Sequence, residues 1–174
     1  MQNHNYMLDV VVRDCDLRKA ADEGMDDFLK VFTDAIYSAI GGTLDAEAMA
    51  KLNASQITLL AYDILRTEVM DGGFVQLIYN GYGGFIFVNP FAKAVRQWGI
   101  ESLASLIKKA HKLYSKYHKQ IEVDCTDEEF MAMFERMPEF DACDDAFVES
   151  EAEFTTAIAE YVDGHIADFA TIDK

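Results

Sequence analysis

The chain has 174 residues, of which 51% are hydrophobic, and its formal net charge is −16. This length is enough for one domain with a sizeable core, and the apolar content excludes intrinsic disorder as the reason for the acidity. A protein this acidic repels nucleic acid and anionic membranes, and it favours basic proteins as partners.

The cysteines and the longest apolar runs indicate which cellular compartment, metal sites and membrane segments to expect. Cys15, Cys125 and Cys143 lie far apart and form no CxxC pair, which argues against a disulfide framework and against a zinc site. Residues 1–8 show no basic segment leading into an apolar stretch, and no run approaches the roughly 20 apolar residues of a membrane span. We therefore expect a cytoplasmic protein that binds no metal, no cofactor and no membrane.

The charges are unevenly distributed along the chain. Residues 1–91 hold 13 acids and 6 bases, residues 92–121 hold one acid and seven bases, and residues 122–174 hold 17 acids and two bases. We call residues 122–174 the acidic segment. We expect the lysines before it to pair with carboxylates of the same chain or of a second subunit, rather than with nucleic acid. These lysines are Lys108, Lys109, Lys112, Lys116 and Lys119.

The first part of the chain, residues 1–54, is expected to form an N-terminal helical arm. Its residues 6–12 fit either a short strand or an apolar arm. From about Asp26, apolar residues recur at three- and four-residue spacing and predict a helix that Gly41-Gly42 ends. A short helix is expected next, at roughly 45–52.

The next helix has a clear start signal. Asn53 followed by Gln56 predicts a capped N-terminus, because each side chain can bond a backbone N–H group of the other residue. We expect Gly72 and Gly73 to end this helix, with Gly72 in the left-handed conformation. The segment that follows, 74–89, is rich in glycine and aromatic residues, which predicts an irregular turn.

Two capping boxes predict further helices in the acidic segment. One is formed by Thr126 with Glu129 and the other by Ser150 with Glu153, and Pro138 separates them. The elements together predict an all-α fold.

The predicted organisation is a single helical domain over residues 1–174. We expect a multi-helix bundle with an irregular Gly-rich turn near 72–89, because helical periodicity dominates on both sides of that turn. No internal repeat and no domain linker is evident.

One motif carries a family resemblance. The sequence EVMDGGFVQLIYN at residues 68–80 joins a helical Glu, a Gly-Gly-Phe-x-Gln turn, and an aromatic residue followed by Asn. This motif resembles the signature of the bacterial DNA-mimic protein family, although Asp71 stands where the family usually has Asn and Leu77 where it has an aromatic residue. The resemblance extends over residues 55–161, which we call the DNA-mimic-like core.

The resemblance implies a helical fold and a binding function. The family takes its name from acidic proteins that present a DNA-like surface to a DNA-binding protein. No HExxH and no GxSxG motif appears in the sequence, so we expect a binding protein and not an enzyme. The expected partner is a basic protein, and a DNA-binding protein is the first candidate. We do not expect this chain to bind nucleic acid directly. A homodimer stays open.

Considered physically, the motif is mainly architectural. Its two glycines let the chain reverse closely, its phenylalanine fills the core beside the helix end, and its polar side chains bond the loose backbone groups of the turn. Alternatively, the polar side chains form a pocket that binds a small ligand or performs catalysis. The residues concerned are Glu68, Gly72, Gly73, Phe74, Gln76 and Asn80.

The acidic segment is the expected binding surface. Its carboxylates can imitate the dense line of phosphates that DNA presents to lysine and arginine side chains. An immunity-type inhibitor of a basic toxin or nuclease would use the same chemistry, and an ordinary solvated acidic face is the remaining alternative. The candidate partner-binding residues are Asp124, Asp127, Glu128, Glu129, Glu135, Glu139, Asp141, Asp144, Asp145, Glu149, Glu151 and Glu153.

Overall fold

Helices dominate the computed structural model of the chain, which describes residues 7–174. They take up 77% of these residues, so the prediction of an all-α fold is confirmed. Residues 1–6 of the predicted N-terminal arm lie outside the described residues. No helix within 7–174 is both long and apolar enough to cross a bilayer.

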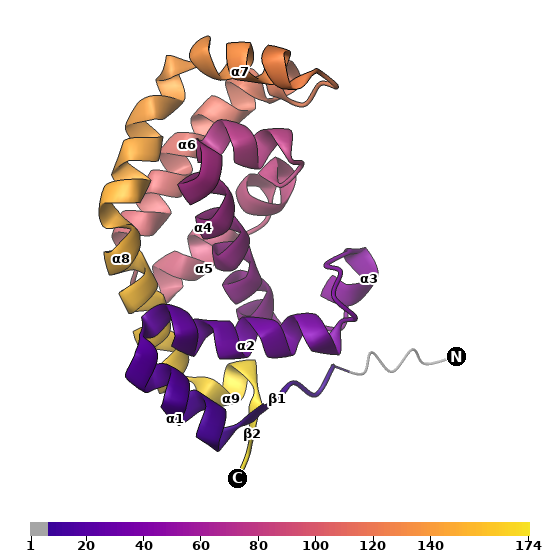
Figure 1. Cartoon of the computed structure of the whole chain (residues 1–174), viewed down its shortest axis with the longest axis vertical. Coiled ribbons are helices and arrows are strands. Elements are labelled where there is room, and N and C mark those ends of the chain that lie inside the picture. The colour runs from indigo at the N-terminus through magenta and orange to yellow at the C-terminus, as the bar shows by residue number, and fades with distance from the viewer. Residues whose placement is uncertain (1–6) are drawn as a thin grey trace. The chain divides into compact units, whose positions relative to one another are not determined.

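In chain order the elements are β1 (Val11–Arg13), α1 (Asp14–Glu23), α2 (Met25–Ala39), α3 (Ala46–Met49), α4 (Ala54–Tyr79), the π-helix η1 (Gly84–Val88), α5 (Phe91–Gln97), α6 (Glu101–Ile121), α7 (Asp127–Glu135), the 3-10 helix η2 (Pro138–Phe140), α8 (Asp141–Gly164), α9 (Ile166–Phe169) and β2 (Thr171–Asp173) (Figure 1).

The chain divides into two units that each bury their own apolar residues. Unit 1 consists of residues 1–60 and 155–174, and unit 2 consists of residues 61–154. The long helices α4 and α8 contribute turns to both units. The single-domain organisation stays a prediction.

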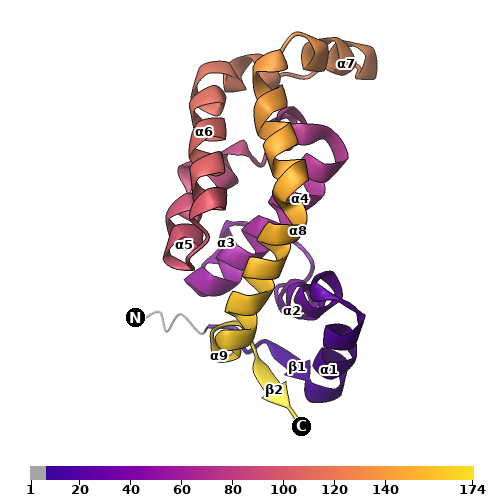
Figure 2. The same ribbon diagram turned by 90° about the vertical axis from the view of Figure 1, so that its left-hand side faces the viewer.

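Unit 1 brings the two ends of the described chain together. β1 pairs in parallel with β2, and Val11 lies opposite Thr171. Val10 and Val12 are buried beneath this two-stranded sheet. The segment that fitted either a strand or an arm therefore supplies a strand, which Figure 2 shows beside β2.

The core of unit 1 is built around helix α2. The helix predicted from about Asp26 is observed as Met25–Ala39, and positive φ angles at Gly41 and Gly42 end it as expected. Phe32 is fully buried, and its ring lies 6.3 Å from that of Phe169 in α9. Residues from both ends of the sequence thus share one core.

The predicted cap of α4 also holds the C-terminal part of the chain. The backbone N–H of Gln56 donates to Asn53 Oδ1 at 2.8 Å, and that of Asn53 donates to Gln56 Oε1 at 3.1 Å. The two side-chain amides donate further to the backbone carbonyls of Asp168 and Phe169. The start signal in the sequence is therefore confirmed, and it has a second role that the sequence did not indicate.

In unit 2, α4 consists of two helical stretches joined by a kink at Gly72 and Gly73. Gly72 has φ −151° and Gly73 has φ +74°, and the helix resumes at Phe74 and runs to Tyr79. The prediction that a helix ends at Gly72 and Gly73 is confirmed, because both residues leave helical φ and ψ values and a second helical stretch follows. The prediction that Gly72 takes the left-handed conformation is wrong. Gly73 adopts the positive φ, because the bend needs only one residue in that region.

Unit 2 packs its aromatic side chains around this bend. Phe74 is fully buried, as predicted, and its ring lies 6.2 Å from Phe87 of η1 and 6.4 Å from Phe147 of α8. Figure 2 shows α6 running alongside the first part of α8. Segments 84–88 and 74–79 are helical, so the region 72–89 holds more regular structure than an irregular turn.

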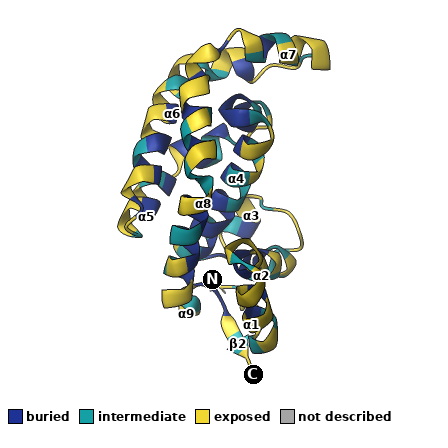
Figure 3. Ribbon diagram, turned by 60° about the vertical axis from the view of Figure 1, so that its left-hand side comes forward, coloured by how far each residue is buried: buried dark blue, intermediate teal, exposed yellow. Residues whose placement is uncertain are grey.

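The two capping boxes predicted in the acidic segment have different outcomes. Thr126 and Glu129 cap α7 as expected, with both reciprocal bonds present. Ser150 and Glu153 open no helix, because α8 runs through them without a break from Asp141 to Gly164. The apolar stripe of α8 continues past this point, and Figure 3 shows buried residues along one side of the helix and exposed residues along the other.

Candidate functional site

The predicted partner-binding residues all lie in unit 2, on α7, α8 and the segments next to them. Their side chains fall into two groups by exposure. Asp144 and Glu151 are half-buried, whereas the other carboxylates of the set are exposed. The two groups have different surroundings.

Helix α8 presents a regular row of exposed carboxylates. Asp141, Asp145, Glu149 and Glu153 follow one another at four-residue spacing, and all four are exposed. Four residues of an α-helix rise by about 6 Å, so the row is evenly spaced along the helix axis. We call these four residues the outer row.

Helix α7 adds carboxylates near its N-terminus. Asp127, Glu128 and Glu129 occupy its first turn, where the helix dipole stabilises negative charge. Glu129 also accepts the backbone N–H of Thr126 at 2.8 Å. Exposed Asp124 comes just before this turn, so the start of α7 is strongly negative.

Glu139 is held in place by a neighbouring helix. The hydroxyl of Tyr117 in α6 donates to Glu139 Oε1 at 2.7 Å, and this bond lowers the pKa of Glu139 below its ordinary value. Lys116 Nζ lies 4.6 Å from the centre of the Tyr117 ring. Glu139 is therefore ionised and oriented at neutral pH.

Asp144 faces the interior of unit 2. Its Oδ1 accepts the backbone N–H of Phe74 at 2.8 Å, which caps the second half of α4 from another helix. Burial raises the pKa of Asp144 to about 6, and the charges of Asp141 and Asp145 add to this rise while the bond from Phe74 opposes it. Asp144 thus connects α8 to the second half of α4.

Glu151 is the second inward-facing carboxylate of α8. It forms an ion pair with Arg66 of α4, and its side chain is only 15% exposed. Asp144 and Glu151 lie seven residues apart, which is about two helical turns, so they share the side of α8 that packs against α4. We call these two residues the inner carboxylates.

The lysines of α6 do not neutralise the outer row. All five are exposed, and within residues 7–174 none of them forms an ion pair. The expected pairing within the same chain is therefore not observed in the described part. Pairing with a second subunit stays a prediction.

The polar residues of the motif bond one another. Glu68 Oε2 accepts from Asn80 Nδ2 at 2.7 Å and from Gln76 Nε2 at 3.3 Å, and Gln76 Nε2 also donates to Asp71 at 2.8 Å. In the described chain these side chains make no hydrogen bond to the turn's backbone, so that expectation is wrong; Asp144 bonds the Phe74 N–H in their place. Because they satisfy one another, we favour a structural network over a ligand pocket.

The first glycine of the motif makes room for this network. A Cβ on Gly72 would lie 2.0 Å from Gln76 Oε1, and one on Gly73 would lie 2.5 Å from Asp144 Oδ2. Each glycine is thus required by a different carboxamide or carboxylate neighbour. Gly72 thus leaves space for Gln76 of the polar network, and Gly73 leaves space for the inner carboxylate Asp144.

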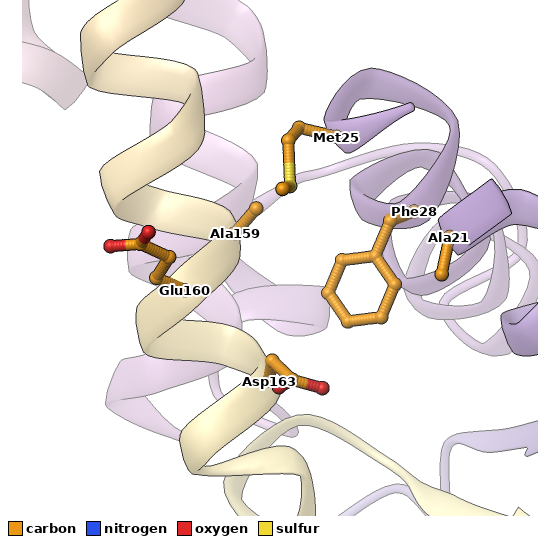
Figure 4. Close-up of a pocket in the computed structure, with 6 residues that line it drawn as sticks. All are labelled: Ala21, Met25, Phe28, Ala159, Glu160 and Asp163. Atoms are coloured by element: carbon orange, nitrogen blue, oxygen red, sulfur yellow. The ribbon is translucent and has the colours of Figure 1, made fainter. Parts of the chain in front are cut away.

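Unit 1 contains an apolar slot that the sequence did not indicate. Its cavity volume is about 200 Å³, and it lies where the end of α1 and the start of α2 face α8 (Figure 4). Contributions from segments more than a hundred residues apart explain why no local pattern pointed to it. The slot is lined by Ala21, Met25, Phe28, Ala159, Glu160 and Asp163.

The described residues offer no evident metal site. Within 7–174, no group of three or more His, Cys, Asp or Glu side chains is placed to hold a metal ion. The carboxylates of the outer row are spaced along a helix and do not converge on a point.

Comparison with known proteins gives two concordant matches. Residues 50–165 match the family model described as DMP19-like protein. A curated relative, the DNA mimic protein DMP19 of Neisseria meningitidis serogroup B, is 35% identical over 129 residues, which cover 74% of this chain and 78% of the relative. The matched region includes the motif at 68–80, the α6 lysines and the outer row.

Proposed function

The chain belongs to the DMP19-like protein family, and we propose that it binds a DNA-binding protein by presenting carboxylates in place of DNA phosphates. Membership of this family favours a protein-binding role over catalysis. The relative's name supports DNA mimicry as the means of binding.

The observation that carries this proposal is the outer row of α8. One strand of duplex DNA presents a phosphate about every 3.4 Å along the helix axis, and the outer row presents a carboxylate about every 6 Å. The row has roughly half the charge density of one strand, and α7 adds further carboxylates. Because α8 is a regular helix, these charges are held at fixed intervals.

The chemistry of the partner follows from this surface. A protein that binds DNA uses lysine and arginine side chains to contact phosphates, and the same side chains suit a row of carboxylates. The outer row stays available because the α6 lysines form no ion pair with it in the described residues. Binding should therefore weaken steeply as salt rises.

Competition with DNA tests this proposal directly. The full chain is immobilised, proteins from source-cell lysate are bound at low salt and eluted at high salt, and the eluted protein is loaded with a labelled DNA duplex. Added free protein should release the duplex in a concentration-dependent manner. A captured protein that binds no DNA, or one whose affinity is flat from low to high salt, contradicts the proposal.

A charge-matched pair of variants makes the assay specific. Asp141→Asn/Asp145→Asn/Glu149→Gln removes three charges from the outer row and should release the duplex at least about tenfold less effectively. Asp34→Asn/Glu47→Gln/Asp173→Asn removes three charges from unit 1 and should act like the unaltered chain. Equal effects of the two variants would show that net charge acts alone, and would contradict a DNA-like row.

A further inference from the structure

The slot of unit 1 is an apolar recess at an acidic edge. Phe28 forms its floor and is 7% exposed, while Met25 stands beside it with 46% of its surface exposed. Figure 4 shows Met25 and Phe28 directed toward Ala159 of α8. An exposed methionine over a buried ring gives an adaptable apolar surface, because its thioether side chain is flexible.

The edge of this recess carries a carboxylate. Asp163 lies at its edge on the Phe28 side, whereas Glu160 points to the outer side of α8 (Figure 4). Both are exposed, and within residues 7–174 neither forms an ion pair. Asp22 and Asp27 adjoin the slot in sequence and are also exposed. The edge of the recess is therefore negative.

The size of the recess limits its occupant. Pockets for drug-sized ligands run from about 300 to 1,000 Å³, whereas this one holds about 200 Å³. One long side chain is a better match than a cofactor. The larger cleft of unit 2, about 430 Å³, has Asp124, Glu129 and Arg136 in its wall, so Arg136 partly offsets its negative charge.

We propose that this slot receives an arginine side chain of the protein partner, with the apolar stem against Met25 and Phe28 and the guanidinium at Asp163. Long basic side chains bury an apolar stem while the charged head stays near water, which fits an apolar recess with an acidic edge. Arginine is also enriched among the residues that dominate interface affinity. The inference rests on the proposed function, since it assigns a basic partner a second point of attachment.

Methionine methyl resonances of the full chain provide the test. The protein is labelled with carbon-13 at the methionine methyl groups, and the Met25 signal is assigned from its loss in Met25→Leu. The probes are Nα-acetyl-arginine amide, Nα-acetyl-citrulline amide and Nα-acetyl-leucine amide. The arginine probe should shift the Met25 signal saturably and at lower probe concentration than leucine or citrulline, which has nearly the same shape without the charge.

Two matched variants separate the edge from general acidity. Asp163→Asn should raise the dissociation constant of the arginine probe about two- to fivefold, the range expected for one exposed charge pair. Glu160→Gln, which removes an equal charge one turn away, should have the smaller effect. Ala159→Leu should fill the slot and abolish the shift, and unchanged signals from the other methionines would show that this variant is folded.

Several results would overturn the inference. An equal shift with citrulline or leucine would mean a neutral or apolar occupant, and a shift that depends on protein concentration without any probe would mean a second copy of the chain. A uniform shift of all methionine signals would mean unspecific attraction. The titration uses no captured protein, so its failure leaves the DNA competition result standing, and the reverse also holds.

Discussion

The outer row and the inner carboxylates of α8 are the same chemical groups on one helix, yet they have opposite surroundings. The outer row is exposed, whereas Asp144 and Glu151 contact α4 through a backbone N–H and an arginine. Helical phase decides the difference, because Asp144 and Glu151 alternate with buried Phe147 and Phe154 along one side. An acidic segment is therefore not uniformly a binding surface.

The largest expected effect comes from Phe74, the core residue whose backbone N–H bonds the inner carboxylate Asp144. Phe74→Ala should lower the free energy of unfolding by about 3–5 kcal/mol, since it removes a fully buried ring that contacts two others. Urea denaturation measures this loss. Val148→Ala, on the exposed side of α8, should change stability by no more than about 0.5 kcal/mol and serves as the control. Equal effects would contradict the assignment of inner and outer sides.

A smaller effect is expected at the glycine that faces Asp144. Gly73→Ala should cost about 1–3 kcal/mol, because the residue has φ +74° and its new Cβ would meet the Asp144 carboxylate. Gly84→Ala is the matched control, since a Cβ there meets nothing within 4 Å and the backbone has no positive φ. If both variants melt at the same temperature, the close approach of Asp144 to the bend is wrong.

The pH dependence of stability should distinguish the inner carboxylate from the outer row. The pKa of Asp144 is raised from 3.8 to about 6, so the folded chain binds more protons than the unfolded chain between these values. Stability from this group is therefore present at low pH and decreases as the pH rises from about 4 to 6. Asp144→Asn should flatten this part of the curve.

The matched control for the titration is Asp145→Asn, which removes an exposed neighbour with the same charge. It should keep most of the decrease between pH 4 and 6, because Asp144 is still present. Unfolding followed at one-half pH intervals measures both curves. Identical curves for the two variants would contradict a buried Asp144.

The smallest effect on stability is expected from the outer row itself. Asp141→Asn/Asp145→Asn/Glu149→Gln should leave the free energy of unfolding within about 0.5 kcal/mol or raise it slightly, because it relieves repulsion between like charges. It should slow association with the captured partner more than it speeds dissociation, since charge steering acts on the on-rate. Rapid-mixing kinetics at two salt concentrations separate the two rates, and a change confined to dissociation would count against steering.

Local patterns in the sequence predicted the helix caps, which depend only on residues within one turn. The capping pairs Asn53 with Gln56 and Thr126 with Glu129 were found because both partners lie within one turn. Ser150 with Glu153 shows the limit of this reasoning. The same spacing occurs inside a helix whose apolar stripe continues, and the stripe takes precedence over the cap signal.

Contacts between distant segments were beyond such patterns. Asp144 caps the helical stretch that begins at Phe74, 70 residues earlier in the chain. Its spacing of seven residues from Glu151 indicates an inward-facing side of α8 only once Phe147 and Phe154 are known to be buried. The apolar slot needs α1, α2 and α8 together, so its residues carry no common local signal. The predicted set held every Asp and Glu from 124 to 153, so it contained the outer row and the inner carboxylates alike, and only their exposure in the structure separates them.

The parallel pairing of β1 with β2 has a consequence for the order of folding. Residues 61–154 of unit 2 are contiguous in sequence and leave the ribosome together, so they can pack before synthesis ends. Unit 1 needs Thr171–Asp173 to complete its sheet and Phe169 to fill its core. During synthesis Phe32 of α2 therefore lacks its contact with Phe169 until more than a hundred further residues have been made. We expect chaperones that bind exposed apolar surface to bind the N-terminal part of the nascent chain during this time.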